Sequence, residues 1–331
     1  MIISRTPFRI SFFGGGTDYP AWFRERGGAV LATTIDKFCY ISVRVLPPFF
    51  AHRYRLVYSI VESVSEIAEI QHPAARAVLQ WNGGDRGLEI HHDGDLPARS
   101  GLGSSSSFTV GLINALKGLD GRMVSKEELA RDAIHIEQCV IREPVGSQDQ
   151  ISAAFGGFNR IEFAPDGAFD VQPMILAHER RHALQSHLML FFSGVSRFSS
   201  EVAQTKIDNL KNRTSELVAM HQMVDEAIDI LRSPSRPLEQ FGRLLHEAWL
   251  LKRSLSERVS TPQIDDIYQL ARGAGALGGK VLGAGGGGFV LFFVPPERQA
   301  SVQHSLQDLI HVPFNFESAG SRIVLYQPHG L

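Results

Sequence analysis

The chain has 331 residues, 44% hydrophobic and 21% charged, a length that exceeds one ordinary core and predicts two domains with a cleft between them. Its 33 basic and 35 acidic residues give a net charge of −2, which argues against a nucleic-acid partner, and no apolar run reaches the ~20 residues that would span a membrane. Because the two cysteines show neither disulfide-framework nor zinc-site spacing, we expect a reducing, cytoplasmic setting.

The first hundred residues are predicted to be rich in strands. Runs of β-branched and aromatic residues bounded by glycine and proline occur at 8–13, 29–47, 53–59 and 88–97. Two helices follow by their periodicity, at 104–119 and 125–141, the second with Ser125 as N-cap and Glu128 completing a capping box. Strands are predicted again at 155–163 and 187–194.

The second half is predicted to be mainly helical. Amphipathic patterns occur at 199–232, 236–257, 263–274 and 297–310. Residues 280–296 are predicted to form two strands around a glycine loop, and residues 321–328 a last strand. A polar, histidine-rich stretch interrupts the pattern near 175–187, so we divide the chain into an N-terminal domain, 1–180, and a C-terminal domain, 181–331.

A glycine- and serine-rich segment, GLGSSSS at 101–107, opens the first predicted helix. A helix N-terminus presents unpaired N–H groups and the positive end of its macrodipole, and glycine lets an anion approach the backbone closely. A flexible turn with one serine as N-cap is the simpler interpretation, but four serines where one would cap favour a ligand site. No lysine follows the glycines, so the segment is not a Walker A loop.

Two further glycine clusters are candidates for parts of a ligand site. GAGGGG at 283–288 matches G-x-G-x-x-G, but a strand-like FVLFFVPP follows where a dinucleotide-binding fingerprint would open a helix, so we exclude that function. A hairpin bend and a loop packed against a ligand stay open for it. GGGTDY at 14–19 places Asp18 after three glycines, and Glu137 and Asp149 are further carboxylates. Each alone is typical of a turn or a solvated surface.

Together, TPFRISFFGGGTD, LPARSGLGSSSS, GSQDQ and GAGGGG occur in an order that resembles the GHMP kinases, the family of galactokinase, homoserine kinase, mevalonate kinase and phosphomevalonate kinase. The motifs span residues 5–288, essentially the whole chain. This resemblance implies a phosphotransferase that uses ATP and Mg²⁺. It also implies an α+β fold, with a ribosomal-protein-S5-like N-terminal domain, a ferredoxin-like C-terminal domain and an active site between them. The oligomeric state is left open, a homodimer included.

The resemblance implies residue roles as well. Asp149 within GSQDQ would be the catalytic base, and Arg9 would steady it as an anion. Glu137 and Ser105 would contact the magnesium ion, with Ser104 and Ser106 as competitors of Ser105. The substrate would lie against Gly15, Gly16, Thr17, Asp18 and Tyr19. ATP would lie against Pro97, Gly101, Leu102, Gly103, Ser104, Ser105, Ser106, Ser107, Gly283, Gly285 and Gly286.

The first motif limits the range of sugars that the resemblance allows as substrate. Galactokinases have Gly-Glu-His-x-Asp-Tyr, whereas this chain has Gly15 and Gly16 in place of Glu-His and keeps Asp18. The retained carboxylate implies a polyhydroxylated acceptor, and the vacated space implies a longer sugar. GGGTD, GSQDQ and FGGFN closely resemble the D-glycero-D-manno-heptose 7-phosphate kinases, which phosphorylate the anomeric hydroxyl of a sugar phosphate on the route to nucleotide-activated heptose.

Three points stay open from the sequence. Kinases of L-fucose or other sugars at the anomeric hydroxyl are the alternative within the same class of activity. A sensor that binds ATP and sugar without turnover, as some members of the family do, is the alternative of another class. The product could feed either capsule or lipopolysaccharide. The candidates for binding the substrate's own phosphate are Arg142, His52, Arg53, Arg55, Arg197 and Lys206.

Overall fold

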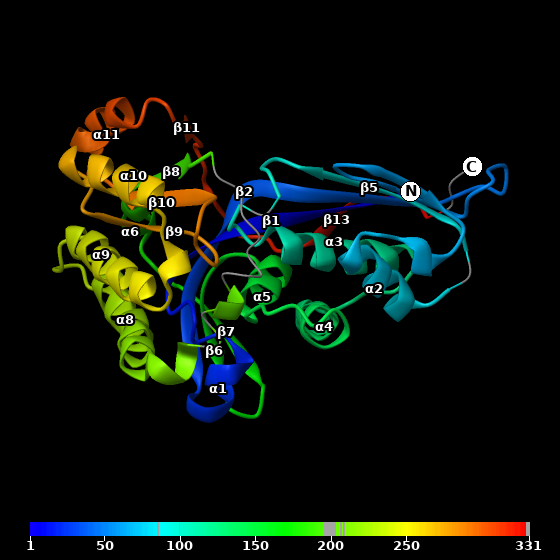
Figure 1. Ribbon diagram of the computed structural model, residues 1–331, viewed down its shortest axis with the longest axis horizontal. Helices are drawn as coiled ribbons and strands as arrows, with labels where there is room; N and C mark the ends of the chain where they lie inside the picture. Colours follow the sequence, from blue (N-terminus) through cyan, green and yellow to red (C-terminus); the bar gives the residue numbers. More distant parts are fainter. Residues whose placement is uncertain (85, 99, 195–202, 206, 208, 329–331) are drawn as a thin grey trace.

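The computed structural model describes residues 1–84, 86–98, 100–194, 203–205, 207 and 209–328. Over this part of the chain, the strands form one nine-stranded and one four-stranded sheet. Figure 1 shows the large sheet with its helices on one side of the molecule and the small sheet with its own helices on the other. Among the helices of the described residues, none carries an apolar stretch long enough to cross a lipid bilayer.

The large sheet is organised around one long strand. Its order is β13-β1-β2-β5-β3-β4, and β6 and β12 also pair with β2. The strands are β1 (Ile2–Phe13), β2 (Gly28–Val45), β3 (Tyr54–Val57), β4 (Val61–Val64), β5 (Leu88–Gly94), β6 (Phe158–Phe163), β7 (Phe169–Pro173), β12 (Phe316–Glu317) and β13 (Arg322–Tyr326). β2 pairs with β6 through residues 28–33 and with β5 through residues 39–45, so it joins both ends of the sheet.

Helices cover one face of the large sheet (Figure 1). They are α2 (Pro73–Asn82), α3 (Ser104–Leu119), α4 (Lys126–His135) and α5 (Gln148–Phe155), with η1 (Ile67–Glu69) before α2 and α1 (Pro20–Arg26) after β1. α3 has the predicted bounds and is buried along most of its length, as its largely apolar sequence requires. α4 continues into a π-helical turn, η2 (Ile136–Val140), and such turns occur often at functional sites.

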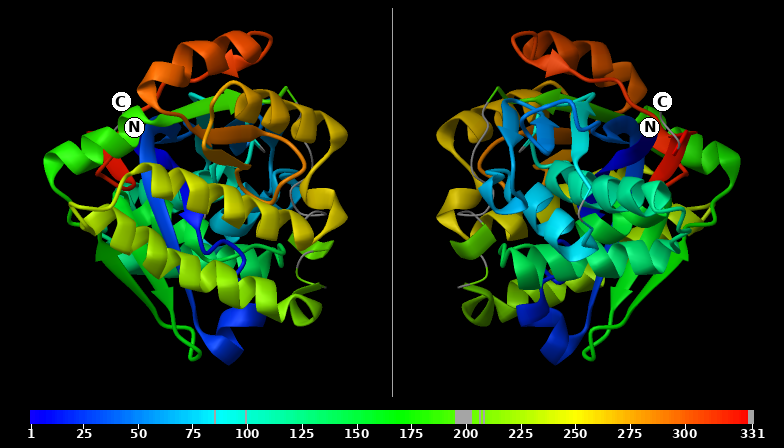
Figure 2. Two further views of the ribbon diagram at one scale, coloured as in Figure 1. Left: turned by 90° about the vertical axis from the view of Figure 1, so that its left-hand side faces the viewer. Right: turned by 90° about the vertical axis from the view of Figure 1, so that its right-hand side faces the viewer.

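The small sheet has the order β11-β8-β10-β9. Its strands are β8 (Leu188–Phe192), β9 (Gly278–Val281), β10 (Phe289–Phe293) and β11 (Ile310–His311). The helices and turns around it are α6 (His178–Ser186), η3 (Leu210–Asn212), α8 (Thr214–Arg232), α9 (Glu239–Ser254), η4 (Glu257–Val259), α10 (Pro262–Gly273), η5 (Pro296–Arg298) and α11 (Gln299–Ser305). Figure 2 shows α8 and α9 running side by side and α11 at the outer edge.

The predicted α+β class is confirmed, and several predicted elements have different bounds. The interrupted stretch at 175–187 contains the helix α6. The helix predicted at 297–310 ends at Ser305, because residues 310–311 pair with β8. The last strand, β13, pairs with β1 in the large sheet, beside the N-terminus. The chain therefore returns to its first sheet, and the division at residue 180 stays a prediction.

The two sheets share one hydrophobic core. Phe12 in β1 lies edge-to-face against Phe241 in α9, with ring centroids 5.5 Å apart, and Phe241 in turn contacts Phe293 in β10. All three rings are fully buried. Because buried aromatic side chains contribute much of the apolar area of a core, these contacts fix how the two parts sit against each other.

The two glycine clusters of the second and fourth motifs contact each other. Gly283 has φ +64°, and a Cβ atom there would lie 2.6 Å from the Cα of Gly101. Gly288 has φ +86°, and a Cβ there would lie 2.2 Å from the carbonyl oxygen of Ser100. The 283–288 loop therefore supports the 101–107 segment from behind, backbone against backbone, and only glycine permits this approach.

A pair of alanine substitutions tests this contact. Gly167 also has a left-handed φ, +91°, but a Cβ there would meet nothing within 4 Å. Both Gly167→Ala and Gly283→Ala should lose about 1 kcal/mol of unfolding free energy from the backbone conformation. Gly283→Ala should lose a further ~1–3 kcal/mol, because overpacking displaces the backbone. Urea denaturation of both variants measures this, and equal losses would contradict the close contact.

Candidate active site

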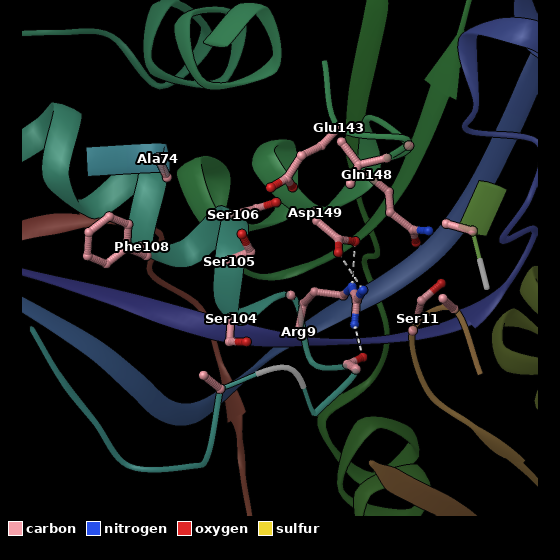
Figure 3. Close-up of a pocket in the computed structure, with 18 of the residues that line it drawn as sticks. Arg9, Ser11, Ala74, Ser104, Ser105, Ser106, Phe108, Glu143, Gln148 and Asp149 are labelled. Carbon is pink, nitrogen blue, oxygen red and sulfur yellow. Dashed lines mark hydrogen bonds and ion pairs between the residues drawn. The ribbon is translucent and has the colours of Figure 1, made fainter. Parts of the chain in front are cut away.

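A cavity of about 930 Å³ lies where the two parts of the molecule meet. Its walls come from β1 and the glycines after it, the starts of α2 and α3, and residues 143–149, all from the first part. The second part contributes Lys252 from α9, Lys280 from β9 and the start of the 283–288 loop. Figure 3 shows the side chains that converge on this space.

Arg9 lies at the centre of the cavity wall, almost fully buried. Its guanidinium donates Nε to Asp149 Oδ1 at 2.8 Å and Nη2 to Asp149 Oδ2 at 2.6 Å, a bidentate pair, and Nη1 to the carbonyl of Gly101 at 2.7 Å (Figure 3). Such a fork fixes both the position and the orientation of a carboxylate. Arg9 therefore holds Asp149, in the first turn of α5, against the glycine-rich segment.

The N-terminus of α3 opens directly beside this pair. Its N-cap, Gly103, has φ +76° and no side-chain cap, and a Cβ there would lie 3.3 Å from Arg9 Cγ and 3.5 Å from Asp149 Oδ2. Ser104, Ser105 and Ser106 in the first turn line the cavity. An anion at this point would meet the positive end of a helix of 16 residues, so the geometry suits a phosphate group.

Glu137 lies behind the serines, on the π-helical turn η2, and is only 1% exposed. Its Oε2 accepts hydrogen bonds from Ser106 Oγ, at 2.9 Å, and from the amide of Gln150. Its Oε1 is buried and makes no hydrogen bond within the described part of the chain. Burial raises the pKa of Glu137 from its ordinary value of 4.5 to about 7, although the neighbouring hydroxyls of Thr109 and Ser106 and the amide of Gln150 partly offset the shift.

One end of the cavity carries polar atoms without protein partners. Ser11 Oγ and Gln148 Oε1 are buried and make no hydrogen bond to the described residues. Asp18 lies beside them, and Gly16 donates its N–H to Asp18 Oδ1 at 2.9 Å. Tyr19 completes this end, and burial, with the charges of Asp18 and Asp149, keeps the pKa of its hydroxyl far above the usual value. Because buried polar groups are normally paired, this end is suited to a ligand rich in hydroxyls.

The opposite end is lined by aromatic rings. His72 and Phe108 are stacked with centroids 4.4 Å apart, and Tyr58 and His92 lie edge-on to them. Figure 3 shows Phe108 on one side of Arg9, and Ser11 and Gln148 on the other. The cavity thus has an aromatic end, a hydroxyl-binding end and, between them, a helix N-terminus beside a carboxylate.

Comparison with known proteins shows to which family the chain belongs. Residues 64–157 match the GHMP kinases N-terminal domain, and residues 208–311 match the GHMP kinases C-terminal domain. A mevalonate kinase of Thermococcus onnurineus is 30% identical over 77% of this chain and 72% of its own length. The chain belongs to the GHMP kinases.

Two further relatives extend over nearly the whole GHMP kinase chain. A D-glycero-alpha-D-manno-heptose 7-phosphate kinase of Campylobacter jejuni is 29% identical over 92% of this chain and 93% of its own. The crystal structure of a D-glycero-D-manno-heptose 1-phosphate kinase from Bacteroides thetaiotaomicron has the same fold, with a TM-score of 0.79 and 24% identity over 97% of this chain and 98% of that one. This kinase is accordingly an ATP-dependent phosphotransferase with the two-domain GHMP kinase fold.

Most of the residues predicted for the kinase site meet at the cavity. Those that line it are Arg9, Gly15, Gly16, Asp18, Tyr19, Gly101, Gly103, Ser104, Ser105, Ser106, Asp149 and Gly283. The hydroxyl that is bonded to Glu137 is that of Ser106. Ser105, the serine that the sequence favours as the magnesium contact, lines the cavity beside it, so the choice between Ser105 and its competitors stays a prediction.

The remaining predicted residues support the site rather than line it. Thr17 Oγ1 donates to the carbonyls of Gly14 and Ala29, and Ser107 Oγ donates to that of Pro7. The carbonyl of Leu102 accepts the N–H of Arg9, and Pro97 lies exposed in the loop before it. Gly285 and Gly286 pack against Val259. Apart from Pro97, each makes a contact that holds a loop of the cavity in place, and their predicted contacts with ATP and substrate stay predictions.

Several cavity residues were not predicted. Gln148 adjoins Asp149 in the GSQDQ motif, so proximity alone could have indicated it, and Ser11 lies in the first motif. Lys252 and Lys280 have no such signal, because they reach the cavity only through folding. Of the candidates for a substrate phosphate, Arg55 pairs with Glu89 on the sheet, and His52, Arg53 and Arg142 are likewise absent from the described cavity wall. Arg197 and Lys206 lie outside the described residues.

The buried Glu137 predicts a pH dependence of stability. Because its pKa is raised in the folded protein, protonation favours the folded state. That contribution is fully present below about pH 4.5 and is lost as the pH rises through about 7. In EDTA, the unfolding free energy of the wild type should fall by about 3 kcal/mol more between pH 4.5 and 8 than that of Glu137→Gln. Parallel urea midpoints across this range would contradict the assignment.

Proposed function

We propose that this kinase transfers the γ-phosphoryl group of ATP to the anomeric hydroxyl of D-glycero-D-manno-heptose 7-phosphate and forms the 1,7-bisphosphate. The observation that carries this proposal is the position of Asp149, held by Arg9 between the N-terminus of α3 and the buried polar atoms of Ser11 and Gln148, which have no hydrogen-bond partner among the described residues. The heptose 7-phosphate kinase of Campylobacter jejuni, similar over nearly the whole chain, supports the choice of sugar. The reaction would take place in the cytoplasm and supply nucleotide-activated heptose for capsule or lipopolysaccharide.

ATP would lie along the cavity with its phosphates at the first turn of α3 and its base among the rings of His72 and Phe108. A Mg²⁺ ion fits between the phosphates and the Ser106–Glu137 pair, because hydroxyl and carboxylate oxygens are the ligands it prefers. The buried Oε1 of Glu137, without a hydrogen bond in the described chain, agrees with this. No group of three metal-binding side chains occurs among the described residues, so the phosphates would supply most of the remaining ligands.

The transfer itself needs little covalent chemistry from the protein. The acceptor oxygen forms a bond to the γ-phosphorus, the bond from that phosphorus to the β–γ bridging oxygen breaks, and ADP leaves. The hydroxyl proton passes to Asp149, which the guanidinium of Arg9 keeps in position. The metal ion would neutralise phosphate charge, and the N–H groups of α3 would orient the phosphates.

The acceptor would occupy the end lined by Ser11, Gln148 and Asp18. Ser11 and Gln148 can both donate and accept hydrogen bonds, and the carboxylate of Asp18 can accept them, so together they can pair with sugar hydroxyls. Gly15 and Gly16 leave this wall without side chains, and a Cβ at Gly15 would lie 3.7 Å from Ser11 Oγ and 3.8 Å from Gln148 Nε2. The part of the cavity next to Gly15 would accommodate the extended end of a heptose.

The direct test is ADP release from MgATP with a panel of acceptors. We expect the highest kcat/KM with D-glycero-D-manno-heptose 7-phosphate, and less with the free heptose, D-mannose and L-fucose. If the enzyme preferred L-fucose, the proposed substrate would be L-fucose instead of heptose 7-phosphate. NMR of the product would show phosphorus coupled to the anomeric proton, and phosphorylation at another hydroxyl would contradict the proposed orientation.

Asp149→Asn tests the base. The amide keeps the shape of the side chain and can still accept one bond from Arg9, but it cannot take up the hydroxyl proton. We expect kcat to fall by ~10²–10⁴ while ATP still binds. Asp170→Asn, an exposed change on β7, is the control and should keep its rate. If Asp149→Asn retained more than about a third of the wild-type kcat, far above the fall typical for a general base, Asp149 would not be the base.

Gly15→Glu tests the position of the substrate's phosphate. The backbone of Gly15 is not left-handed, and the new Cβ would stand at ordinary contact distances, so the fold should tolerate it. The carboxylate should repel an anionic sugar, lowering kcat/KM for heptose 7-phosphate at least ~10-fold more than for free heptose. Gly15→Gln adds the same bulk without charge and should lower both alike. Equal effects of Glu and Gln would place the phosphate elsewhere.

A further inference from the structure

The second part of the molecule contributes a buried lysine to the cavity wall. Lys252, in the last turn of α9, is 5% exposed and lines the cavity. Its Nζ donates to the carbonyl of Val281 at 2.6 Å and to that of Gly283 at 2.7 Å. These bonds hold a positive charge at the start of the 283–288 loop.

Successive contacts connect this ammonium to the Arg9–Asp149 pair. Gly283 packs backbone to backbone on Gly101, so closely that a Cβ would lie 2.6 Å from its Cα. The carbonyl of Gly101 accepts a hydrogen bond from Arg9 Nη1, and Arg9 holds Asp149. Lys252, from the second part of the chain, thus holds one of the two glycine loops that contact each other, and Arg9, from the first part, holds the other.

Lys280, the other lysine of the wall, is placed differently. It is 4% exposed, and its Nζ donates to the carbonyl of Phe12, the residue after Ser11. Ser11 marks the hydroxyl-binding end of the cavity, on the far side of Arg9 from Phe108 (Figure 3). Lys252, by contrast, is bonded to the 283–288 loop, which packs on the glycine-rich segment before α3, between the two ends of the cavity.

We propose that Lys252 is a catalytic residue whose ammonium contacts the γ-phosphoryl oxygens of ATP during transfer. While the phosphorus–oxygen bond to ADP breaks and the bond to the acceptor oxygen forms, negative charge is distributed over the phosphoryl oxygens and the leaving oxygen. A fixed cation in a partly buried site stabilises that charge without reorganising. Lys252 takes no proton from the acceptor, since that proton passes to Asp149.

This assignment makes the active site dependent on both parts of the molecule. The base and its arginine belong to the large sheet and α5, whereas Lys252 belongs to α9. The contact between the glycine loops sets their separation. The inference rests on the phosphoryl transfer and on the proposed place of the γ-phosphate, but not on the identity of the sugar.

Lys252→Gln is the main test. The amide can still donate to the carbonyls of Val281 and Gly283, so the structural bonds are largely kept while the charge is removed. We expect kcat to fall by ~10²–10³, as for loss of one group that stabilises transition-state charge, with a melting temperature close to that of the wild type. The dissociation constant of ATP should change less than threefold. A folded variant that keeps kcat within threefold overturns the proposal, because the lysine then serves only the loops.

Lys252→Cys provides a second test that restores the charge chemically. Alkylation with 2-bromoethylamine converts the cysteine to a lysine analogue, whereas iodoacetamide gives a neutral side chain of similar length. We expect the amine to restore at least a tenth of the wild-type kcat and the amide to restore none. Wild type treated in the same way controls for modification of the exposed Cys139. Equal rates after both reagents overturn the proposal.

These outcomes are separate from those that test the proposed function. Each variant is assayed with whichever acceptor the wild type uses best, so a preference for L-fucose or free heptose changes the sugar and leaves the role of Lys252 intact. Conversely, a wild type that prefers heptose 7-phosphate, together with a Lys252→Gln variant of normal kcat, supports the function and removes the lysine from the mechanism.

Discussion

The site depends on the ion pair and hydrogen bonds that the guanidinium of Arg9 makes. This guanidinium forms a two-pronged ion pair with Asp149 and a third hydrogen bond to the carbonyl of Gly101, so one side chain joins β1, α5 and the glycine-rich segment before α3. Arg9 is almost fully buried, and a buried charge is stable only when it is paired. The pair that positions the proposed base is therefore also required for the packing around it.

Several positions around this pair are restricted to glycine by backbone conformation or by close contacts. Gly103 has a left-handed φ of +76°, which favours glycine, and Gly146 must lack a side chain because a Cβ would overlap the carboxylate of Asp18. Gly283 and Gly101 bring the two parts of the chain within backbone contact. Small residues here bring charged groups together, which in the proposed mechanism lets Lys252 contact the phosphoryl group while Arg9 holds the base, Asp149.

The sequence indicated much of the fold and most of the site's members. Motifs carry information about local geometry, so GLGSSSS predicted the N-terminus of α3 correctly, and the periodicity of residues 104–119 gave its bounds. Short helices such as α1 and α2 were not predicted, because seven to ten residues give a weak periodic signal. The strand β13 was predicted, but its place beside β1 was not, since pairing between residues more than 300 positions apart leaves no local pattern.

By itself, the sequence determined the family and the helix N-terminus that follows GLG, because each depends on residues close together in the chain. An anion at that N-terminus and a base at Asp149 in GSQDQ stay predictions. Only the tertiary structure decided that Ser106 rather than Ser105 is bonded to Glu137, and that this glutamate is buried deeply enough to raise its pKa to about 7. It alone brought Lys252 and Lys280 to the cavity. The physical reason is that burial and the proximity of charges result from three-dimensional packing. The local sequence around four adjacent serines or a single lysine does not reveal either.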